Sequence, residues 1–169
     1  MADPDLPDID ELDEPRPGHG RPFVPDSFVV PGPPRTDQFW LEPLGPQHNE
    51  SDYAAWTSSV EHIHATPGFE HRRWPHPMSL AENLGDLEMH ARHFEQRLGF
   101  TFTVRDATRG TGVGDVIGCV YVYPSEDAGV DVVVRSWVRV SRAALDAEVA
   151  AVVQQWLDDV WPFRAVHYR

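Results

Sequence analysis

The feature that most restricts the fold is an apolar run at positions 116–123, VIGCVYVY. Apolar side chains occupy both odd and even positions, so a strand made from this run has two apolar faces. Such a strand is stable in the middle of a sheet that other layers cover on both sides. The chain is therefore predicted to be an α/β protein with helices on both faces of a central sheet.

Further strands are expected on either side of this run. Residues 38–43 form a short apolar segment that ends at a proline and a Gly-Pro turn, and residues 100–105 alternate apolar with polar side chains. Residues 130–140 are predicted to form a second long strand, and 164–169 a closing strand. We expect a mainly antiparallel sheet, with one late helical crossover before the last strand.

Apolar residues at spacings of three and four predict three helices. The first lies within residues 49–63. The second begins at Ser79, which opens a Ser-x-x-Glu capping box, and ends at Gly99. The third is expected to begin with Ser141 as its cap and to end before Pro162. The proline-rich segment between the first two helices is predicted to be a loop.

The first 35 residues have a composition typical of disordered chains. They contain nine of the 16 prolines and eight acidic residues, and their few apolar residues show no periodicity. We therefore expect a disordered acidic arm at 1–35 and one domain at 36–169. Removal of this arm is expected to leave thermal stability nearly unchanged.

Charge and composition exclude several functions. The chain has 14 basic residues, all arginine, against 27 acidic ones, which disfavours binding to nucleic acid and to anionic membranes. It has no 18-residue apolar window for a membrane helix, and its N-terminus is acidic, unlike a secretion signal. The single cysteine, Cys119, leaves no internal disulfide, and we expect a cytoplasmic protein.

The order of the predicted elements resembles the GNAT superfamily of acyl-CoA N-acyltransferases. FWLEPLGPQHNESDYAAW (39–56) is similar to the family's first strand and helix, and VIGCVYVYP (116–124) to its fourth strand. VVVRSWVRV (132–140) and AEVAAVVQQWL (147–157) resemble its fifth strand and third helix. The resemblance covers roughly residues 38–169 and implies a GNAT-like fold with acetyl-CoA as cosubstrate.

In this family, a glycine-containing loop between the fifth strand and third helix binds the CoA pyrophosphate. The corresponding stretch here, RVSRAALD (139–146), contains no glycine, so its alanine Cβ atoms crowd the backbone. Arginine side chains are able to bind phosphate in place of backbone N–H groups. The resemblance therefore implies cofactor-binding residues at Trp137, Val138, Arg139, Ser141 and Arg142.

The resemblance also implies two proton-transfer roles. Family members often place the tyrosine that protonates the CoA thiolate beyond their sixth strand, and this sequence ends before such a position. Tyr121 and Tyr123 on the central strand are the candidate acids. Candidate bases for the acceptor amine are His64, with His62 beside it, and Asp131.

Seven of the nine histidines lie between residues 48 and 93. The pairs His62-x-His64 and His90-x-x-His93 each place two nitrogen ligands on one side of the chain. No HExxH frame accompanies them, and transition-metal sites usually add a carboxylate or thiolate at fixed spacing. A histidine-based metalloenzyme is therefore the least favoured alternative, and we expect no metal.

The expected function is direct transfer of an acetyl group from acetyl-CoA to the amine of a small molecule or peptide. The alternative is a catalytically silent GNAT-like module that binds a small molecule or a protein partner, which the missing glycines favour. A homodimer is also expected, because a bare sheet edge near residues 164–169 would be protected by a second copy.

Overall fold

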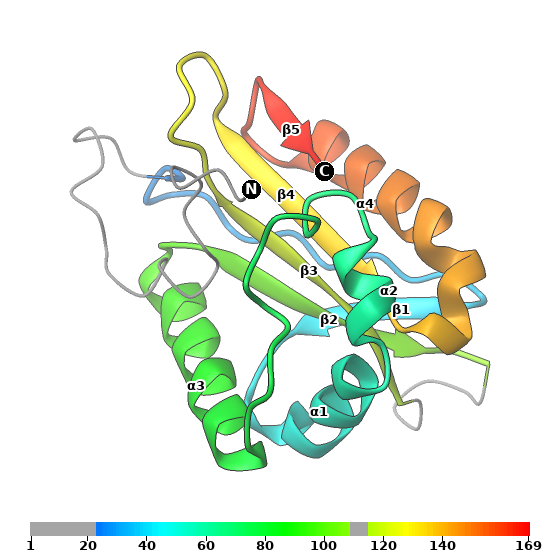
Figure 1. Ribbon diagram of the computed structural model, residues 1–169. Coiled ribbons are helices and arrows are strands. Elements are labelled where there is room, and N and C mark those ends of the chain that lie inside the picture. Colours follow the sequence, from blue (N-terminus) through cyan, green and yellow to red (C-terminus); the bar gives the residue numbers. More distant parts are fainter. Residues whose placement is uncertain (1–22, 109–114) are drawn as a thin grey trace.

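A five-stranded sheet forms the centre of the computed structural model, which describes residues 23–108 and 115–169 (Figure 1). Its strand order follows the sequence, β1-β2-β3-β4-β5. The first three pairings are antiparallel, and β5 pairs with β4 in parallel. The strands are β1 (Phe39–Pro43), β2 (Phe100–Asp106), β3 (Val116–Pro124), β4 (Val132–Val138) and β5 (Val166–Tyr168).

Strand β3 is buried on both faces, as its sequence predicts. Val120 and Val122 face one apolar cluster, whereas Tyr121 and Tyr123 face a second cluster on the other side. The prediction of a mainly antiparallel sheet between two layers is therefore confirmed. The strands that the family resemblance counts as fourth and fifth are the third and fourth of this sheet.

Helices cover both faces of the sheet. Helix α4 (Asp146–Val160) packs its apolar side chains against the valines and phenylalanines of the first cluster. The other face carries α1 (Asn49–Thr57), α2 (Val60–His64) and α3 (Leu80–Gln96), which stand in front of the sheet in Figure 1. Two short 3-10 helices precede α1 and α4, namely η2 (Pro46–His48) and η3 (Val140–Leu145). No helix in the described part of the chain is long and apolar enough to cross a membrane.

The helix predicted for residues 49–63 is in fact two helices, α1 and α2. The break lies at two serines whose hydroxyl groups bond to the backbone, which competes with helix propagation. Ser58 Oγ donates to the carbonyl of Ala55 at 2.9 Å, and Ser59 Oγ accepts the N–H of Val140 at 2.9 Å. The break therefore ties the end of α1 to the segment that leaves β4.

Two other helix ends differ from the sequence prediction. The capping box at Ser79 is present, but α3 ends at Gln96, and Arg97 rather than Gly99 takes the left-handed conformation, with φ of 61°. Ser141 does not cap α4. It lies within η3, where the Arg142 N–H donates to the Arg139 carbonyl, and α4 begins only at Asp146 without a side-chain cap.

The prediction that disorder extends to residue 35 is wrong. Val24 is buried in the first core cluster, and Phe23 stacks on Phe100 with ring centres 5.7 Å apart. Arg97 donates to the carbonyls of Pro25 and Phe28, both at 2.7 Å. The apolar side chains of this segment are too few to show a periodic pattern in the sequence. They nevertheless pack against the core, because the surface of the core is apolar here. Residues 1–22 of the predicted arm lie outside the described residues.

Removal of residues 1–35 is expected to lower the free energy of unfolding by at least about 2 kcal/mol relative to removal of 1–22 alone. The longer deletion strips Val24 and Phe23 from the core, and burial of one such side chain stabilises by roughly 1.5–3 kcal/mol. Urea denaturation of the two truncated proteins measures the difference. Equal midpoints and slopes would contradict the docking of residues 23–35.

Candidate functional site

The sheet opens between β4 and β5. Their pairing ends at Val134 and Tyr168, after which the N–H of Arg169 donates to the Val134 carbonyl at 2.9 Å. Odd-numbered residues of β4 bond to β3, so the N–H groups of Ser136 and Val138 face the open side. In the described residues, no strand pairs with β4 along this stretch. Its unpaired backbone is suited to binding an extended ligand that carries amide groups.

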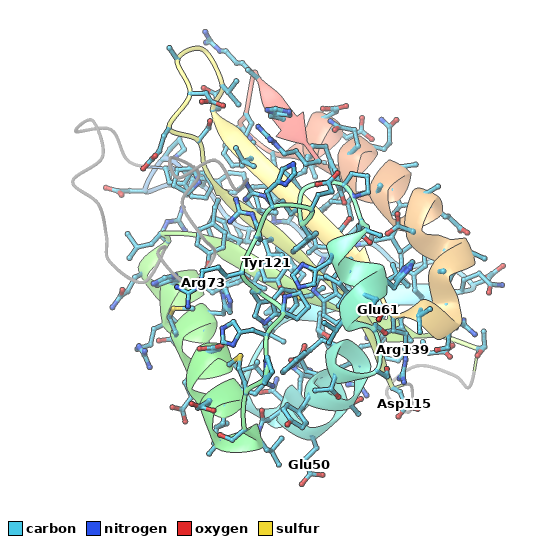
Figure 2. The ribbon with its side chains drawn as sticks, viewed as in Figure 1. Glu50, Glu61, Arg73, Asp115, Tyr121 and Arg139 are labelled. Carbon is cyan, nitrogen blue, oxygen red and sulfur yellow. The ribbon has the colours of Figure 1, made fainter. Side chains whose placement is uncertain are left out.

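The open edge leads to a pocket at the carboxyl end of β4. The pocket has a volume of about 500 Å³, and its lining comes from the junction of α1 and α2 and from Val140. Arg139 approaches this junction, with Nη2 3.4 Å from the Ser58 hydroxyl. Figure 2 shows Arg139 and Glu61 at this end of the molecule, and Tyr121 over the middle of the sheet. The lining residues are Thr57, Ser58, Ser59, Val60, Glu61, His62 and Val140.

Two buried nitrogen atoms beside this pocket have no hydrogen-bond partner among the described residues. They are Nε2 of His62 and Nε of Arg139. A buried polar atom without a partner costs about 1–3 kcal/mol, so a ligand that reached these atoms would recover that free energy. Burial raises the pKa of Asp146 at the start of α4, and the nearby His62 opposes this rise. The pocket therefore adjoins the positive end of the α4 dipole.

Three predicted cofactor residues follow β4 on the chain segment that includes Val140 of the pocket lining. Arg139 and Ser141 follow directly after β4, and Arg142 Nη2 lies 3.5 Å from a carboxylate oxygen of Asp106. The other two predicted residues, Trp137 and Val138, have fully buried side chains. A ligand on the open edge would therefore contact these two positions through their backbone.

Tyr121 and Trp137 lie together in the second core cluster. Trp137 Nε1 donates to the Tyr121 hydroxyl at 3.1 Å. Burial raises the pKa of Tyr121 well above its ordinary value, and the nearby Cys119 and Asp52 raise it further. Tyr121 therefore keeps its proton at neutral pH and is not available as a base.

Within the second core cluster, Tyr123 contacts the two histidines of α3. Its hydroxyl lies 2.8 Å from Nδ1 of His90 and 3.1 Å from Nδ1 of His93. Burial lowers the pKa of His90 to about 3, so its ring stays neutral. Both Nδ1 atoms contact a hydroxyl group. The described residues contain no group of three potential ligands that could hold a metal ion.

The two predicted bases lie apart from each other. His64 ends α2, and its Nε2 contacts the carbonyl of Pro75 at 2.8 Å, which braces the following loop. Asp131 accepts the backbone N–H groups of Arg164 and Ala165, and these bonds lower its pKa. Asp131 precedes β4 whereas the pocket follows it, a separation of roughly 20 Å along the strand.

Asp52 of α1 carries a buried carboxyl group that was not among the residues predicted from the sequence. Asn83 donates to its Oδ2 at 3.1 Å, and burial raises the pKa of Asp52 to about 6. A carboxylate in the first turn of a helix is usually exposed, which is why it drew no attention. Its position four residues before the buried Trp56 places it on the same helix face, and this spacing was the available signal.

The fold is similar to those of solved acetyltransferases. One is a ribosomal-protein-S5-alanine acetyltransferase from Vibrio fischeri, with a TM-score of 0.56 and 11% identity over 75% of this chain. Another is RimL, a ribosomal L7/L12 α-N-protein acetyltransferase, with a TM-score of 0.53 and 7% identity over 74% of this chain. A third is the microcin C7 self-immunity acetyltransferase MccE in complex with acetyl-CoA and AMP, with a TM-score of 0.53 and 11% identity over 74% of this chain.

These similarities show that the chain has the fold of these acetyltransferases, as the resemblance to the GNAT superfamily predicted for the fold. The chain spans less than two thirds of each of these proteins, 63% of RimL, 65% of the Vibrio enzyme and 66% of MccE. No protein-family model and no curated protein matches the sequence. Activity therefore has to be argued from the site itself.

Proposed function

We propose that this protein is an N-acyltransferase that transfers an acetyl group directly from acetyl-CoA to an amine. The observation that carries the proposal is the open edge of β4, where the N–H groups of Ser136 and Val138 lack strand partners in the described chain. Acetyl-CoA would supply an activated thioester, and its amide-containing arm suits an unpaired strand edge. The GNAT fold supports the same assignment.

The backbone of β4 would stabilise the reacting carbonyl group. N–H donors fixed in a sheet need no reorganisation when negative charge develops on a carbonyl oxygen, and one such donor commonly contributes 10²–10³ in rate. Ser136 and Val138 are both buried, so water competes little with these donors. Ser136 is fixed further because its Oγ accepts the Tyr168 hydroxyl at 2.7 Å.

Arginine side chains would replace the missing glycines in phosphate binding. Arg139 lies beside the pocket with a buried and unpartnered Nε, and Arg142 is only weakly engaged by Asp106. Guanidinium groups bind phosphate oxygens by charge-assisted hydrogen bonds. Ser141 lies in η3, between Arg139 and α4, and its hydroxyl group would be a further donor to the phosphates.

Proton transfer is assigned to two of the predicted residues. Tyr121 holds a proton, and we assign it as the donor to the departing thiolate, with the Trp137 indole N–H stabilising the phenolate that donation would leave. His64 lies on α2, which lines the pocket, whereas Asp131 is at the opposite end of β4, so we assign the base to His64. The acceptor would be a small molecule or a peptide. RimL and the Vibrio enzyme are ribosomal-protein acetyltransferases, which is consistent with a peptide amine.

Calorimetric titration with acetyl-CoA tests this proposal. We expect micromolar binding by the wild type and a loss of about ten- to a hundredfold in affinity in Arg139→Ala and Arg142→Ala, since each change removes charge-assisted hydrogen bonds. Arg92→Ala is the matched control, because Arg92 is exposed on α3. If millimolar acetyl-CoA produced no heat with the wild type, the proposal would be wrong and the silent binding module would be favoured.

A further inference from the structure

A cluster of three arginines lies where β4 and β5 separate. Arg169 follows β5 directly, next to Arg135 of β4 in the parallel register. The loop after α2 lies over this place (Figure 1), and a Cβ atom built on Gly68 would lie 2.9 Å from Cβ of Arg169 and 3.4 Å from Cγ of Arg135. Gly68 has a φ of +90°, so the glycine allows the loop to approach both stems. Arg72 comes from the same loop.

These guanidinium groups repel one another. Burial lowers the pKa of Arg135 to about 9, and the charges of Arg72 and Arg169 lower it further. Among the described residues, the charges that shift the pKa of Arg135 come from arginines and not from a carboxylate. Nε of Arg135 and Nε of Arg169 are both buried without a hydrogen-bond partner. Such a concentration of positive charge is unfavourable unless an anion is bound there, and the chain as a whole carries a net charge of −13.

The carboxylate of Glu70 lies near the edge of this cluster. Glu70 interacts electrostatically with Arg169 and with His71. Its Oε2 accepts the N–H of Gly68 at 2.7 Å, which holds it on the exposed side of the loop. A single exposed and solvent-screened carboxylate does little to neutralise the guanidinium groups of Arg135 and Arg169, whereas Nε of Arg72 donates to the Gly68 carbonyl at 3.2 Å.

The cluster is adjacent to the proposed site of acetyl transfer. Arg135 immediately precedes Ser136, whose N–H faces the open edge, and one residue of a strand spans about 3.3 Å. Arg135 pairs with Tyr121, so its side chain is on the same face of the sheet as Tyr121 and Trp137. An acceptor bound at the arginines would therefore need only a short spacer to bring its amine to the β4 edge.

We propose that Arg135 and Arg169, with Arg72 beside them, bind an oxyanion, a carboxylate or a phosphate, carried by the acceptor whose amine is acetylated. This inference rests on the proposed function and narrows its substrate class to amines that bear an anionic group. Planar guanidinium groups bind both kinds of oxyanion through paired N–H donors, so the shared chemistry is that of a charged oxygen group.

Thermal unfolding of the full chain tests the site without any acetyl-CoA. The probes are inorganic phosphate, L-glutamate and ethanolamine, each compared with sodium chloride at equal ionic strength. Phosphate or glutamate is expected to raise the melting temperature in a saturable manner, because a ligand that binds the native state stabilises it. Ethanolamine carries no anionic group and is expected to leave the melting temperature unchanged. A phosphate response identifies a phosphorylated acceptor, and a glutamate response identifies a carboxylate one. No response beyond chloride from either anion would overturn the proposal.

Substitutions then locate the site. Arg135→Gln and Arg169→Gln are each expected to weaken anion binding about tenfold or more. Arg135→Lys keeps a positive charge and is expected to weaken binding less. The control Arg92→Gln changes an exposed residue and is expected to leave anion binding unchanged. Melting temperatures in chloride check folding, and they should change little in Arg135→Gln because this change relieves repulsion. Unchanged anion affinity in both glutamine variants would overturn the proposal.

Calorimetry with acetyl-CoA separates this inference from the proposed function. Arg135→Gln is expected to keep wild-type affinity for acetyl-CoA. A loss as large as that in Arg139→Ala would assign the cluster to the cosubstrate and overturn the acceptor site. Saturable anion binding without any acetyl-CoA binding would overturn the proposed function while supporting the anion site.

Discussion

Acidification from pH 7 to pH 4.5 is expected to change the stability of Asp52→Asn and His90→Asn in opposite directions relative to the wild type. Asp52 has a pKa of about 6 in the folded protein, above its ordinary value of 3.8. The contribution of Asp52 to the free energy of unfolding is fully present below pH 3.8 and is lost as the pH rises through 6. The wild type therefore gains roughly 2 kcal/mol from Asp52 on acidification, and Asp52→Asn lacks this gain.

His90 has the opposite effect on the stability of the protein as the pH falls. Its pKa falls from 6.5 to about 3 because the ring is buried, and His93 lowers it further. The folded protein therefore resists protonation of His90, and stability is lost as the pH falls below 6.5. Over the same pH interval the wild type loses roughly 2–3 kcal/mol through this group. His90→Asn removes the loss, and its amide oxygen can still accept the Tyr123 hydroxyl, which lies 2.8 Å from Nδ1 in the wild type.

Urea denaturation of the three proteins at both pH values measures these contributions. The relevant quantity is the change in unfolding free energy between pH 7 and pH 4.5, so any packing defect of a variant cancels. Asp52→Asn should lose about 2 kcal/mol more than the wild type, and His90→Asn about 2–3 kcal/mol less. Parallel changes in all three proteins would show that neither group is buried as described.

The layered fold was predictable because it depends on local patterns that agree with one another. The apolar run at 116–123 requires cover on both faces, and the capping box at Ser79 marks the start of α3. The break at Ser58 and Ser59 was not predictable, because it depends on a bond from Ser59 to Val140, far along the chain. Docking of residues 23–35 likewise depends on a surface that the folded core creates.

The site was harder to predict than the fold, because its residues come from segments with no common motif. Arg139 and Arg142 were predicted from the family resemblance, which places a phosphate-binding loop between this strand and the following helix. Arg135 looked like an ordinary polar residue of a strand, and only the register with Tyr121 and the loop carrying Gly68 gives it buried neighbours. Pairwise register of this kind cannot be derived from one sequence.

The Gly118→Ala substitution is expected to destabilise the protein by about 3 kcal/mol or more. Gly118 pairs with Val138, and an added Cβ would collide with the backbone carbonyl of Trp137 and lie 3.2 Å from Cα of Val138. Backbone atoms in the middle of a sheet cannot rotate away as a flexible side chain can, so β3 and β4 have to separate locally.

Gly85→Ala is the matched control for this substitution. Gly85 lies in α3, and a Cβ added there meets no atom within 4 Å. The change should stabilise the protein by roughly 0.5–1 kcal/mol, since alanine is the better helix former. Urea denaturation compares the two variants, and equal stabilities would contradict the close approach of β3 to β4. Because the displaced residue is Val138, whose N–H faces the open edge, Gly118→Ala should also weaken acetyl-CoA binding in molecules that remain folded, whereas Gly85→Ala should not.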